Sequence, residues 1–269
     1  MSSKKQKWTN TMAQVWKNYR PPIRPSKDDL RVFNEFLEKK IKQYGKEVKV
    51  LILGSTPEFR DLVNSKKLTV YVCDYNKKNN EALKLLKKVK GKDVLILQDW
   101  IKLKLNEKFD LVFAEASLNM VKGSDVPIIL RNVKNILKDD GLFLAKTWVR
   151  VSKSLVPMDK IIRIYRTKYK GKSFKNYMNQ YLLSNFYDRG NGSLNGQYLG
   201  MKRLYEKGQI TKKEFSSVLG LDYETTPLVL YLPMKKELTK IVKKYMKLVR
   251  IITPKPVGTN KVPVYVMKK

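Results

Sequence analysis

The first 150 residues alternate between short apolar runs and amphipathic stretches. The apolar runs are rich in Val, Ile and Leu, which is typical of strands that are buried on both faces of a parallel sheet. The stretches between them repeat apolar residues at the three- and four-residue intervals of a helix. Such alternation predicts an α/β domain. The predicted strands are residues 48–53, 68–73, 93–98, 109–114 and 142–148.

Helices are predicted before the first strand and between the others. The first spans about 29–44, with Ser26 or Asp28 as its cap and Gly45 at its end. Further helices are predicted at 57–64, 77–88 and 126–137, with Ser124 as the cap of the last one and a turn at 139–141.

The pattern changes after residue 148. Residues 149–233 form helical pieces rich in Tyr, Asn and Lys, broken at 190–193, which predicts a helical cap over the carboxyl edge of the sheet. A helix at 235–248 and strands at 249–253 and 262–267 follow, and an antiparallel edge on a parallel sheet is common. The expected organisation is an N-terminal arm and α/β core at 1–148, a cap at 149–233 and a closing helix and strands at 234–269.

Three successive predicted strands end on an acidic residue, namely Asp74, Asp99 and Glu115. Parallel strands point their carboxyl ends at one edge, where an open α/β sheet binds its ligand. Gly54 ends the first strand and allows a close backbone approach, because it has no Cβ. Asp74 is then placed to accept ribose hydroxyls, and Asp99 to accept an adenine amine proton beside the apolar wall of Trp100. No G-x-G-x-x-G follows the first strand, so the pattern does not favour a dinucleotide.

These motifs resemble those of class I S-adenosylmethionine-dependent methyltransferases over about residues 48–148. The segments that carry the resemblance are 50–58, 72–74, 98–100 and 109–119. The resemblance implies a Rossmann-like, seven-stranded sheet with the helical cap inserted after the fifth strand, S-adenosyl-L-methionine as cofactor and methyl transfer as reaction. The first motif departs from the commonest family pattern, because Thr56-Pro57-Glu58 stands where further glycines are usual. The implied cofactor-binding residues are Gly54, Ser55, Thr56, Glu58, Asp74, Tyr75, Asp99, Trp100 and Glu115.

A polar cluster of Glu115, Ser117 and Asn119 follows the fourth strand, where a purely structural segment would hold apolar residues or glycine. These are the candidate catalytic residues. Glu115 is expected either to hold the ammonium of the methionine moiety or to accept the proton of the methyl acceptor, and Ser117 and Asn119 to orient either molecule. The alternative role of Asp99 is to cap the segment that begins at Trp100.

Aromatic residues in the arm and the cap are candidates for a lid or a substrate pocket. Trp16 and Tyr19 precede Pro21-Pro22, and closure of such an arm would exclude water from the sulfonium. The alternative is that these side chains only anchor the arm and fill the core of the cap. The candidates in the cap are Tyr177, Tyr181 and Tyr187.

Residue usage excludes several classes. The chain has no histidine, which rules out a His-dependent hydrolase and a His-bound zinc or iron centre, and no metal site is expected. Cys73 is the only cysteine, so no internal disulfide forms, and a reducing, cytoplasmic setting is expected. No apolar stretch approaches twenty residues and residues 1–5 lack the apolar core of a signal peptide, so neither a membrane span nor secretion is expected.

The formal charge of +33 comes from 46 Lys and 11 Arg against 24 acidic residues. The basic residues are spread along every predicted helix, which fits either a composition bias or an anionic partner. A small or medium-sized acceptor, methylated on oxygen or nitrogen, is the first expectation, because the cap would enclose it. An RNA methyltransferase or RNA-binding protein and an aminopropyltransferase are the alternatives. No Asn/Asp-Pro-Pro-aromatic segment, typical of nucleobase N-methylation, follows the fourth strand. The sequence does not indicate an oligomeric state.

Overall fold

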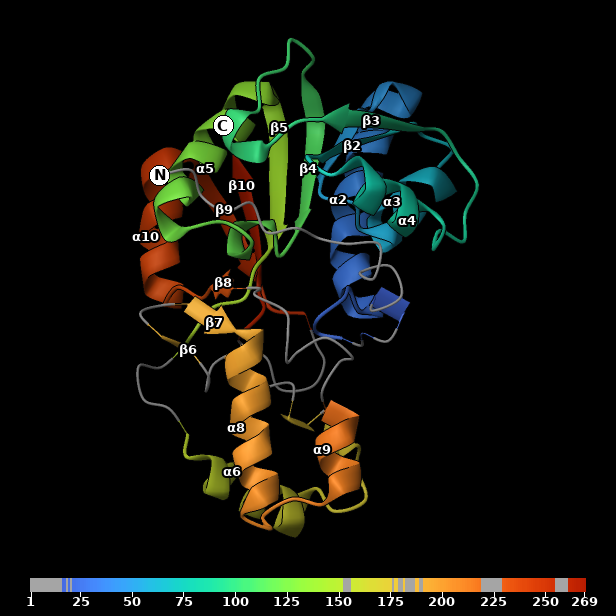
Figure 1. Ribbon diagram of the computed structural model, residues 1–269. Coiled ribbons are helices and arrows are strands. Elements are labelled where there is room, and N and C mark those ends of the chain that lie inside the picture. The colour runs from blue at the N-terminus through green and yellow to red at the C-terminus, as the bar shows by residue number, and fades with distance from the viewer. Residues whose placement is uncertain are drawn as a thin grey trace.

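The computed structural model describes residues 16–17, 19, 21–151, 156–175, 177–178, 181, 187–188, 191–218, 229–254 and 261–269. Figure 1 shows an upper lobe built on a large sheet and a lower lobe of helices joined to it by short strands. Among the described residues, none of the helices combines the length and the apolarity that a membrane span requires.

Seven strands form the large sheet in the order β3-β2-β1-β4-β5-β10-β9. Strands β1 to β5 pair in parallel, and β10 runs antiparallel to both of its neighbours. The predicted α/β class, the seven-stranded sheet and its antiparallel edge are therefore confirmed. The bounds are β1 Val50–Leu53, β2 Val70–Asp74, β3 Asp93–Leu97, β4 Phe109–Glu115, β5 Leu137–Lys146, β9 Lys247–Ile252 and β10 Val264–Lys268.

Each face of the sheet has its own core, because successive strand residues point to opposite faces. In β1, Leu51 and Leu53 pack with α5 (Val126–Ile136) and α10 (Lys235–Tyr245). Val50 and Ile52 pack on the other face with α2 (Lys27–Tyr44) and α3 (Pro57–Ser65). Figure 1 shows α5 and α10 to the left of the sheet and α2 and α3 to its right. The sheet is therefore covered on both faces, and its carboxyl edge is left for the site.

Local sequence explains where α2 begins. The Oγ atom of Ser26 accepts the backbone N–H of Asp29 at 3.0 Å, and the Asp29 carboxylate accepts the backbone N–H of Ser26 at 2.7 Å. This reciprocal capping box confirms Ser26 as the cap. The helix after β2, α4, spans Lys77–Lys84 and is shorter than predicted.

Two local predictions were wrong. Ser124 does not cap α5, because a 3₁₀ turn, η4 (Gly123–Asp125), precedes the helix and places Asp125 at its cap position. The predicted turn at 139–141 lies inside β5, where the register shifts as Leu137 pairs with Phe109 and Leu142 with Leu111. A Cβ at Gly141 would lie 2.8 Å from the Phe109 carbonyl oxygen, so glycine allows the irregularity by permitting close backbone contact.

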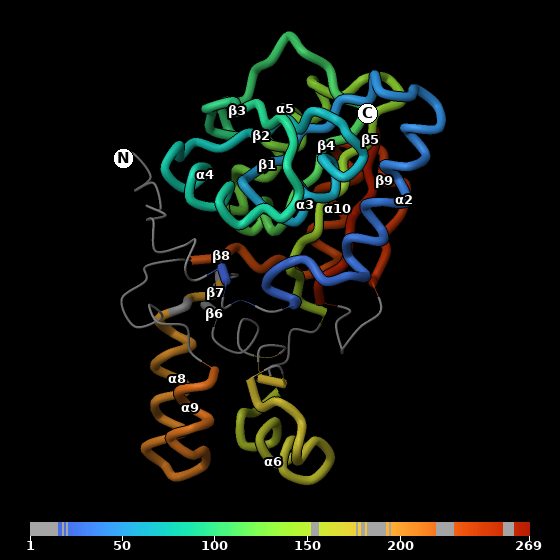
Figure 2. The backbone as a smooth tube through the Cα atoms, turned by 90° about the vertical axis from the view of Figure 1, so that its right-hand side faces the viewer, coloured from blue at the N-terminus to red at the C-terminus, as the bar shows by residue number. Residues whose placement is uncertain are grey.

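The second lobe differs from the purely helical cap that was predicted. It contains a three-stranded antiparallel sheet, and the expected break at 190–193 includes one of its strands. The apolar run Val229-Leu230-Tyr231 supplies another. Figure 2 shows the lobe below the large sheet, and β8 lies against η3 (Ser117–Asn119), which follows β4. Its elements are α6 Met158–Lys168, β6 Tyr187–Asp188, β7 Asn191–Ser193, α8 Leu194–Glu206, α9 Lys212–Val218 and β8 Val229–Tyr231.

Candidate functional site

The turn after β1 forms one wall of the site. Gly54 has φ = 97°, a conformation that favours glycine, and its N–H donates to the Cys73 carbonyl oxygen at 2.8 Å. The Trp100 indole donates to the same carbonyl oxygen at 2.9 Å. Its ring would lie 3.5 Å from a Cβ at Gly54, so Trp100 stands beside the turn as an apolar wall.

Asp74 ends β2 and is buried at the same edge. Its Oδ2 accepts the Ser55 hydroxyl at 2.6 Å and the Asn79 side-chain amide at 3.4 Å, while Oδ1 accepts the backbone N–H of Asn76 at 3.0 Å. A carboxylate offers about four acceptor directions, so one remains open. The buried Oδ1 of Asn79 has no hydrogen-bond partner in the part of the chain that the structure describes. Asp74 and Asn79 together therefore present two open acceptors. Sequence reasoning missed Asn79, although its place in the first turn after β2 was a signal.

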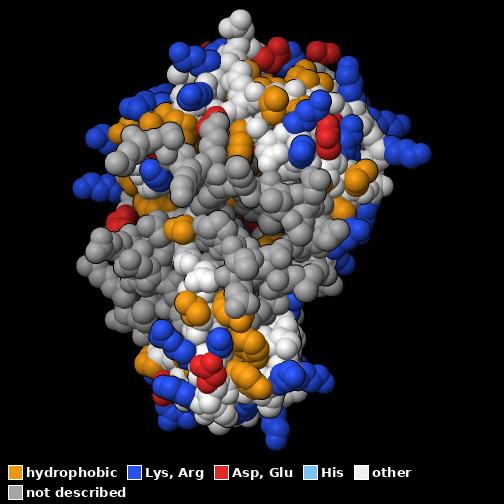
Figure 3. Space-filling view, viewed as in Figure 1, with side chains coloured by type: hydrophobic (Ala, Val, Ile, Leu, Met, Phe, Trp, Pro, Cys, Tyr) orange, Lys and Arg blue, Asp and Glu red, His pale blue; other side chains and the backbone are white. Residues whose placement is uncertain are grey.

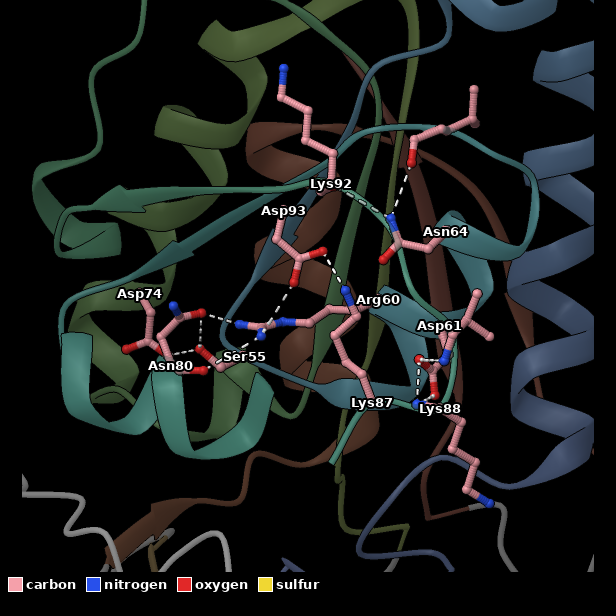
Figure 4. A network of polar contacts seen from close by, with 12 residues as sticks. Ser55, Arg60, Asp61, Asn64, Asp74, Asn80, Lys87, Lys88, Lys92 and Asp93 are labelled. Carbon is pink, nitrogen blue, oxygen red and sulfur yellow. Dashed lines mark hydrogen bonds and ion pairs between the residues drawn. The ribbon is translucent and has the colours of Figure 1, made fainter. Parts of the chain in front are cut away.

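A buried arginine supports this arrangement from the side, as Figure 4 shows. Arg60 is fully buried in α3 and donates to the side chain of Asn80, whose Oδ1 lies 3.4 Å from the Ser55 hydroxyl. The guanidinium also lies 3.6 Å from Asp93, which Lys87 contacts at 2.6 Å. Burial lowers the pKa of Arg60. The charged network thus holds the loop that carries Ser55 against Asp74.

The second part of the site is a buried ion pair at the ends of β4 and β5. Glu115 and Lys146 are partners in the strand register, and Lys146 Nζ lies 2.8 Å from Glu115 Oε1. Their side chains are only 2% and 1% exposed. Removal from water raises the pKa of Glu115 to about 8, although Lys146 acts in the opposite direction. The other oxygen, Oε2, is buried and has no hydrogen-bond partner among the described residues. Glu115 is therefore a carboxyl group that can exchange a proton near neutral pH.

Lys146 also binds the N-terminal segment that contains Pro22 and Arg24. Its ammonium donates to the carbonyl oxygens of Pro22 at 2.9 Å and Arg24 at 3.4 Å, and lies 3.5 Å from Asp29. Four oxygens thus surround the ammonium, which makes Lys146 an orienting group for Glu115. Sequence reasoning missed this residue, although a lysine in an otherwise apolar strand was a signal.

The arm is tied to the site through Glu58, the second residue of α3. Glu58 Oε1 accepts Arg24 Nε at 2.7 Å and lies 3.4 Å from the Trp16 indole nitrogen. Trp16 is buried, and Tyr19 contacts it edge to face with 6.2 Å between ring centroids. Within the described residues, Glu58 Oε2, like Glu115 Oε2, is buried without a hydrogen-bond partner. Trp16 therefore lies against Glu58, with Tyr19 packed on it, and the lid role of both residues stays a prediction.

Other candidates make structural hydrogen bonds. Asp99 Oδ1 accepts the backbone N–H of Ile101 at 3.1 Å and caps η2 (Trp100–Lys102), as its alternative role required. The Ser117 hydroxyl donates to the Leu53 carbonyl oxygen at 2.8 Å. The Asn119 amide donates to the carbonyl oxygens of Trp148 and Tyr231 at 2.9 and 2.7 Å, and its Oδ1 accepts the backbone N–H of Trp148. This geometry favours structural roles for Ser117 and Asn119, because it occupies their polar atoms with backbone groups.

The remaining predicted residues fall into two groups. Thr56 is buried at the cap position of α3, and Tyr75 is half-buried directly after Asp74. In the second lobe, Tyr177 is buried and donates to the Ile161 carbonyl oxygen at 3.0 Å, and Tyr181 packs on it, which favours core roles for both. Tyr187 lies in β6, and its side chain is outside the described part. Within the described residues, no three His, Cys, Asp or Glu side chains are grouped to hold a metal ion.

The sequence family described as "Methyltransferase domain" matches residues 54–145, a segment that contains Gly54, Asp74 and Glu115. Residues 54–145 are therefore a methyltransferase domain. This domain match indicates an S-adenosylmethionine-dependent methyltransferase, which is consistent with class I. No curated protein sequence matches the chain.

Several solved structures share the fold of this methyltransferase. An S-adenosylmethionine-dependent methyltransferase from Clostridium acetobutylicum is 15% identical, with 96% of this chain and 98% of that chain covered and a TM-score of 0.54. The N-methyltransferase NodS from Bradyrhizobium japonicum, in complex with S-adenosyl-L-homocysteine, is 8% identical, with coverages of 96% and 98% and a TM-score of 0.51. A putative zinc-dependent alcohol dehydrogenase from Rhodobacter sphaeroides is 13% identical, with coverages of 97% and 100% and a TM-score of 0.57. At these identities the likeness concerns the fold alone.

Proposed function

We propose that this methyltransferase transfers a methyl group from S-adenosylmethionine to an oxygen or nitrogen atom of a small or medium-sized acceptor, with Glu115 receiving the acceptor's proton. The observation that carries the proposal is the buried Glu115 carboxyl, which has one oxygen oriented by Lys146 and the other without a partner. Such an oxygen at the carboxyl edge is available to a ligand that brings its own hydrogen-bond donor.

The hydrogen-bond acceptors and the aromatic side chain at this edge fit S-adenosylmethionine. The open acceptors of Asp74 and Asn79 match the two hydroxyls of a ribose, and Trp100 offers an apolar face for an adenine. The ammonium of the methionine moiety would donate a hydrogen bond to Glu58 Oε2, which has no partner among the described residues. The complex of NodS with S-adenosyl-L-homocysteine supports this assignment, because it is a ligand-bound enzyme of the same fold.

The bound cofactor supplies a methyl group already activated by the sulfonium. The protein therefore has to align the acceptor and manage one proton. Glu115 Oε2 would accept that proton in its ionised form, while the four oxygens around the Lys146 ammonium keep the Glu115 side chain in place. Trp16 and Arg24 would exclude water through their contacts with Glu58.

Two structural features support an acceptor of limited size. The segment containing Pro22 and Arg24 covers Glu115 through its bonds to Lys146. From the other side, Asn119 ties β8 of the second lobe to the ends of β4 and β5. An acceptor has to enter between these two coverings, which is easier for a small molecule than for a folded polymer.

Incubation with methyl-labelled S-adenosylmethionine and separate pools of metabolites, RNA and protein tests the proposal. We expect label in the metabolite pool with the wild-type protein. We expect transfer to be lowered at least about 100-fold with Glu115→Gln. We expect it to be unchanged with Glu35→Gln, because Glu35 lies on α2 in an exposed ion pair with Lys39. Label in the RNA or protein pool alone would contradict the small acceptor, and label in no pool would contradict methyl transfer under these conditions.

A further inference from the structure

A row of cations runs along α10 and continues onto the neighbouring helix α5. All are exposed, and none forms an ion pair with a carboxylate among the described residues. Figure 3 shows Lys and Arg side chains along the left margin of the molecule, the side on which Figure 1 places α10. We call this row the α10 cationic face; its members are Lys236, Lys240, Lys243 and Lys244 of α10, Lys247 at the start of β9, and Arg131 of α5.

The α10 cationic face is one surface because its residues recur at helical intervals. Lys236, Lys240 and Lys244 are four residues apart, so they lie on one side of the helix. Arg131 of α5 belongs to the same surface. Its guanidinium lies 5.4 Å from the centroid of the Tyr245 ring, and the Lys244 ammonium lies 5.7 Å from the same centroid. The helix spans about 16 Å at its rise per residue, so the face is long enough to contact several phosphates.

Nothing within the helix balances this charge. Glu237 is the only acidic residue of α10, and its carboxylate accepts the backbone N–H of Met234 at the start of the helix. Lysines near the end of a helix are favoured by the helix dipole, but Lys236 lies in the first turn and Lys240 at the middle of the helix. Like charges four residues apart repel each other. An anionic partner would relieve this repulsion.

We propose that the α10 cationic face binds the phosphate backbone of a single-stranded nucleic acid. A membrane surface is the poorer partner, because an interfacial helix inserts its apolar face, whereas Leu238 and Val242 of α10 are buried in the core of the sheet. No residue of α10 is among the exposed large hydrophobic residues. Tyr245 is half-buried beside Arg131 and Lys244, so the face combines cations with an aromatic ring, as surfaces that bind single strands do.

The position of α10 connects this face to the site edge. The backbone N–H of Lys235 donates to the Arg150 carbonyl oxygen at 2.8 Å, and Arg150 lies just beyond the end of β5. The first turn of α10 is therefore at the carboxyl edge. The inference goes beyond the proposed methyl transfer, and it holds whether the acceptor is free or belongs to the bound nucleic acid.

Fluorescence anisotropy with a labelled single-stranded poly(U) RNA tests this binding in the full-length protein. With about five phosphates neutralised, the affinity of the wild type should fall about 100-fold between roughly 50 and 200 mM salt. Changing Lys236, Lys240, Lys243 and Lys244 to Gln should weaken binding at low salt at least about tenfold and reduce the salt slope by about three, since each lost contact lowers it by about 0.7.

The matched control removes the same charge at the opposite edge of the sheet, by changing the exposed residues Lys84, Lys88, Lys90 and Lys92 to Gln. It should keep most of the wild-type affinity and slope. Equal losses in the two variants would mean that only net charge matters, and would overturn the proposal. So would undetectable RNA binding at low salt. With vesicles containing phosphatidylserine, a loss of binding in the α10 variant while RNA binding persists would assign the face to membranes and overturn the proposal.

Discussion

Replacing Glu115 with Gln should lower kcat about 10²- to 10⁴-fold, the usual contribution of a positioned general base. Gln keeps the size of the side chain but cannot accept a proton at Oε2, the oxygen that is buried without a partner. The steady-state rate of methyl transfer, measured with the acceptor pool that becomes labelled in the incubation experiment, gives the size of the effect. The dissociation constant of the cofactor should change little, because the proposed proton acceptor acts on the other substrate.

Stability has to be checked alongside, since Glu115 shares a buried ion pair with Lys146. Lys146 keeps its bonds to the Pro22 and Arg24 carbonyl oxygens in the variant, so we expect it to fold. Circular dichroism and the midpoint of thermal unfolding monitor this. A folded Glu115→Gln protein with normal turnover would exclude Glu115 as the base. Weakened cofactor binding with unchanged kcat would assign it to the methionine ammonium instead.

The pH dependence follows from the same carboxyl. Its pKa is raised to about 8, so kcat/KM, which reports the free enzyme, should rise with pH until it levels off above that value. Stability changes in the opposite direction. A carboxyl with a raised pKa binds its proton more tightly in the folded state, so its stabilising contribution is complete below the unfolded pKa of 4.5 and is lost as pH rises through about 8. Both dependences should be absent in Glu115→Gln.

Asp74→Ala should weaken S-adenosylmethionine binding between about 10-fold and 100-fold, because it removes a hydrogen bond to a charged acceptor that is worth about 1.5–3 kcal/mol. Asn79→Ala should have a smaller effect of about 2- to 10-fold, since the amide oxygen is a neutral acceptor. Isothermal titration calorimetry of each variant measures the dissociation constants. Losing Asp74 also leaves the Ser55 hydroxyl without its 2.6 Å partner, so part of the effect comes from the loop.

The matched control is Asp139→Ala, which removes the same charge near the start of β5, where Asp139 pairs with Lys269 on the surface. Its dissociation constant should equal that of the wild type. If Asp74→Ala also binds with wild-type affinity, the ribose is held elsewhere.

The sheet and one side of the site were predictable from local sequence. Strands β1 to β4 are nearly continuous apolar runs, and a parallel arrangement alone brings their final residues to one edge. That reasoning placed Gly54, Asp74 and Glu115 at the carboxyl edge, where the structure has them. The cap of α2 was predicted as Ser26 or Asp28, and Ser26 is the cap in the structure.

The rest depended on contacts between distant segments. Lys146 gains its role from Pro22 and Arg24, more than 120 residues away, and no local pattern encodes that contact. Asn119 was predicted to bind a ligand because it is polar. Its amide instead donates to the carbonyl oxygens of Trp148, after β5, and Tyr231, in β8, which would otherwise lack this donor. The sheet of the second lobe was missed because β6 and β7 are too short to show a period of two.

Calorimetric titration of the wild-type protein with S-adenosylmethionine tests the central claim most directly, namely that the edge formed by Gly54, Asp74 and Glu115 is a cofactor site. We expect saturable binding of about one molecule per chain, with S-adenosyl-L-homocysteine competing for the same site. We also expect the backbone amides of Ile23 and Arg24 to gain protection from hydrogen exchange in the complex, because this segment is bonded to Lys146 beside Glu115. Absence of binding by the folded protein would contradict the claim. So would saturable binding that leaves hydrogen exchange in the arm unchanged and that Asp74→Ala does not weaken.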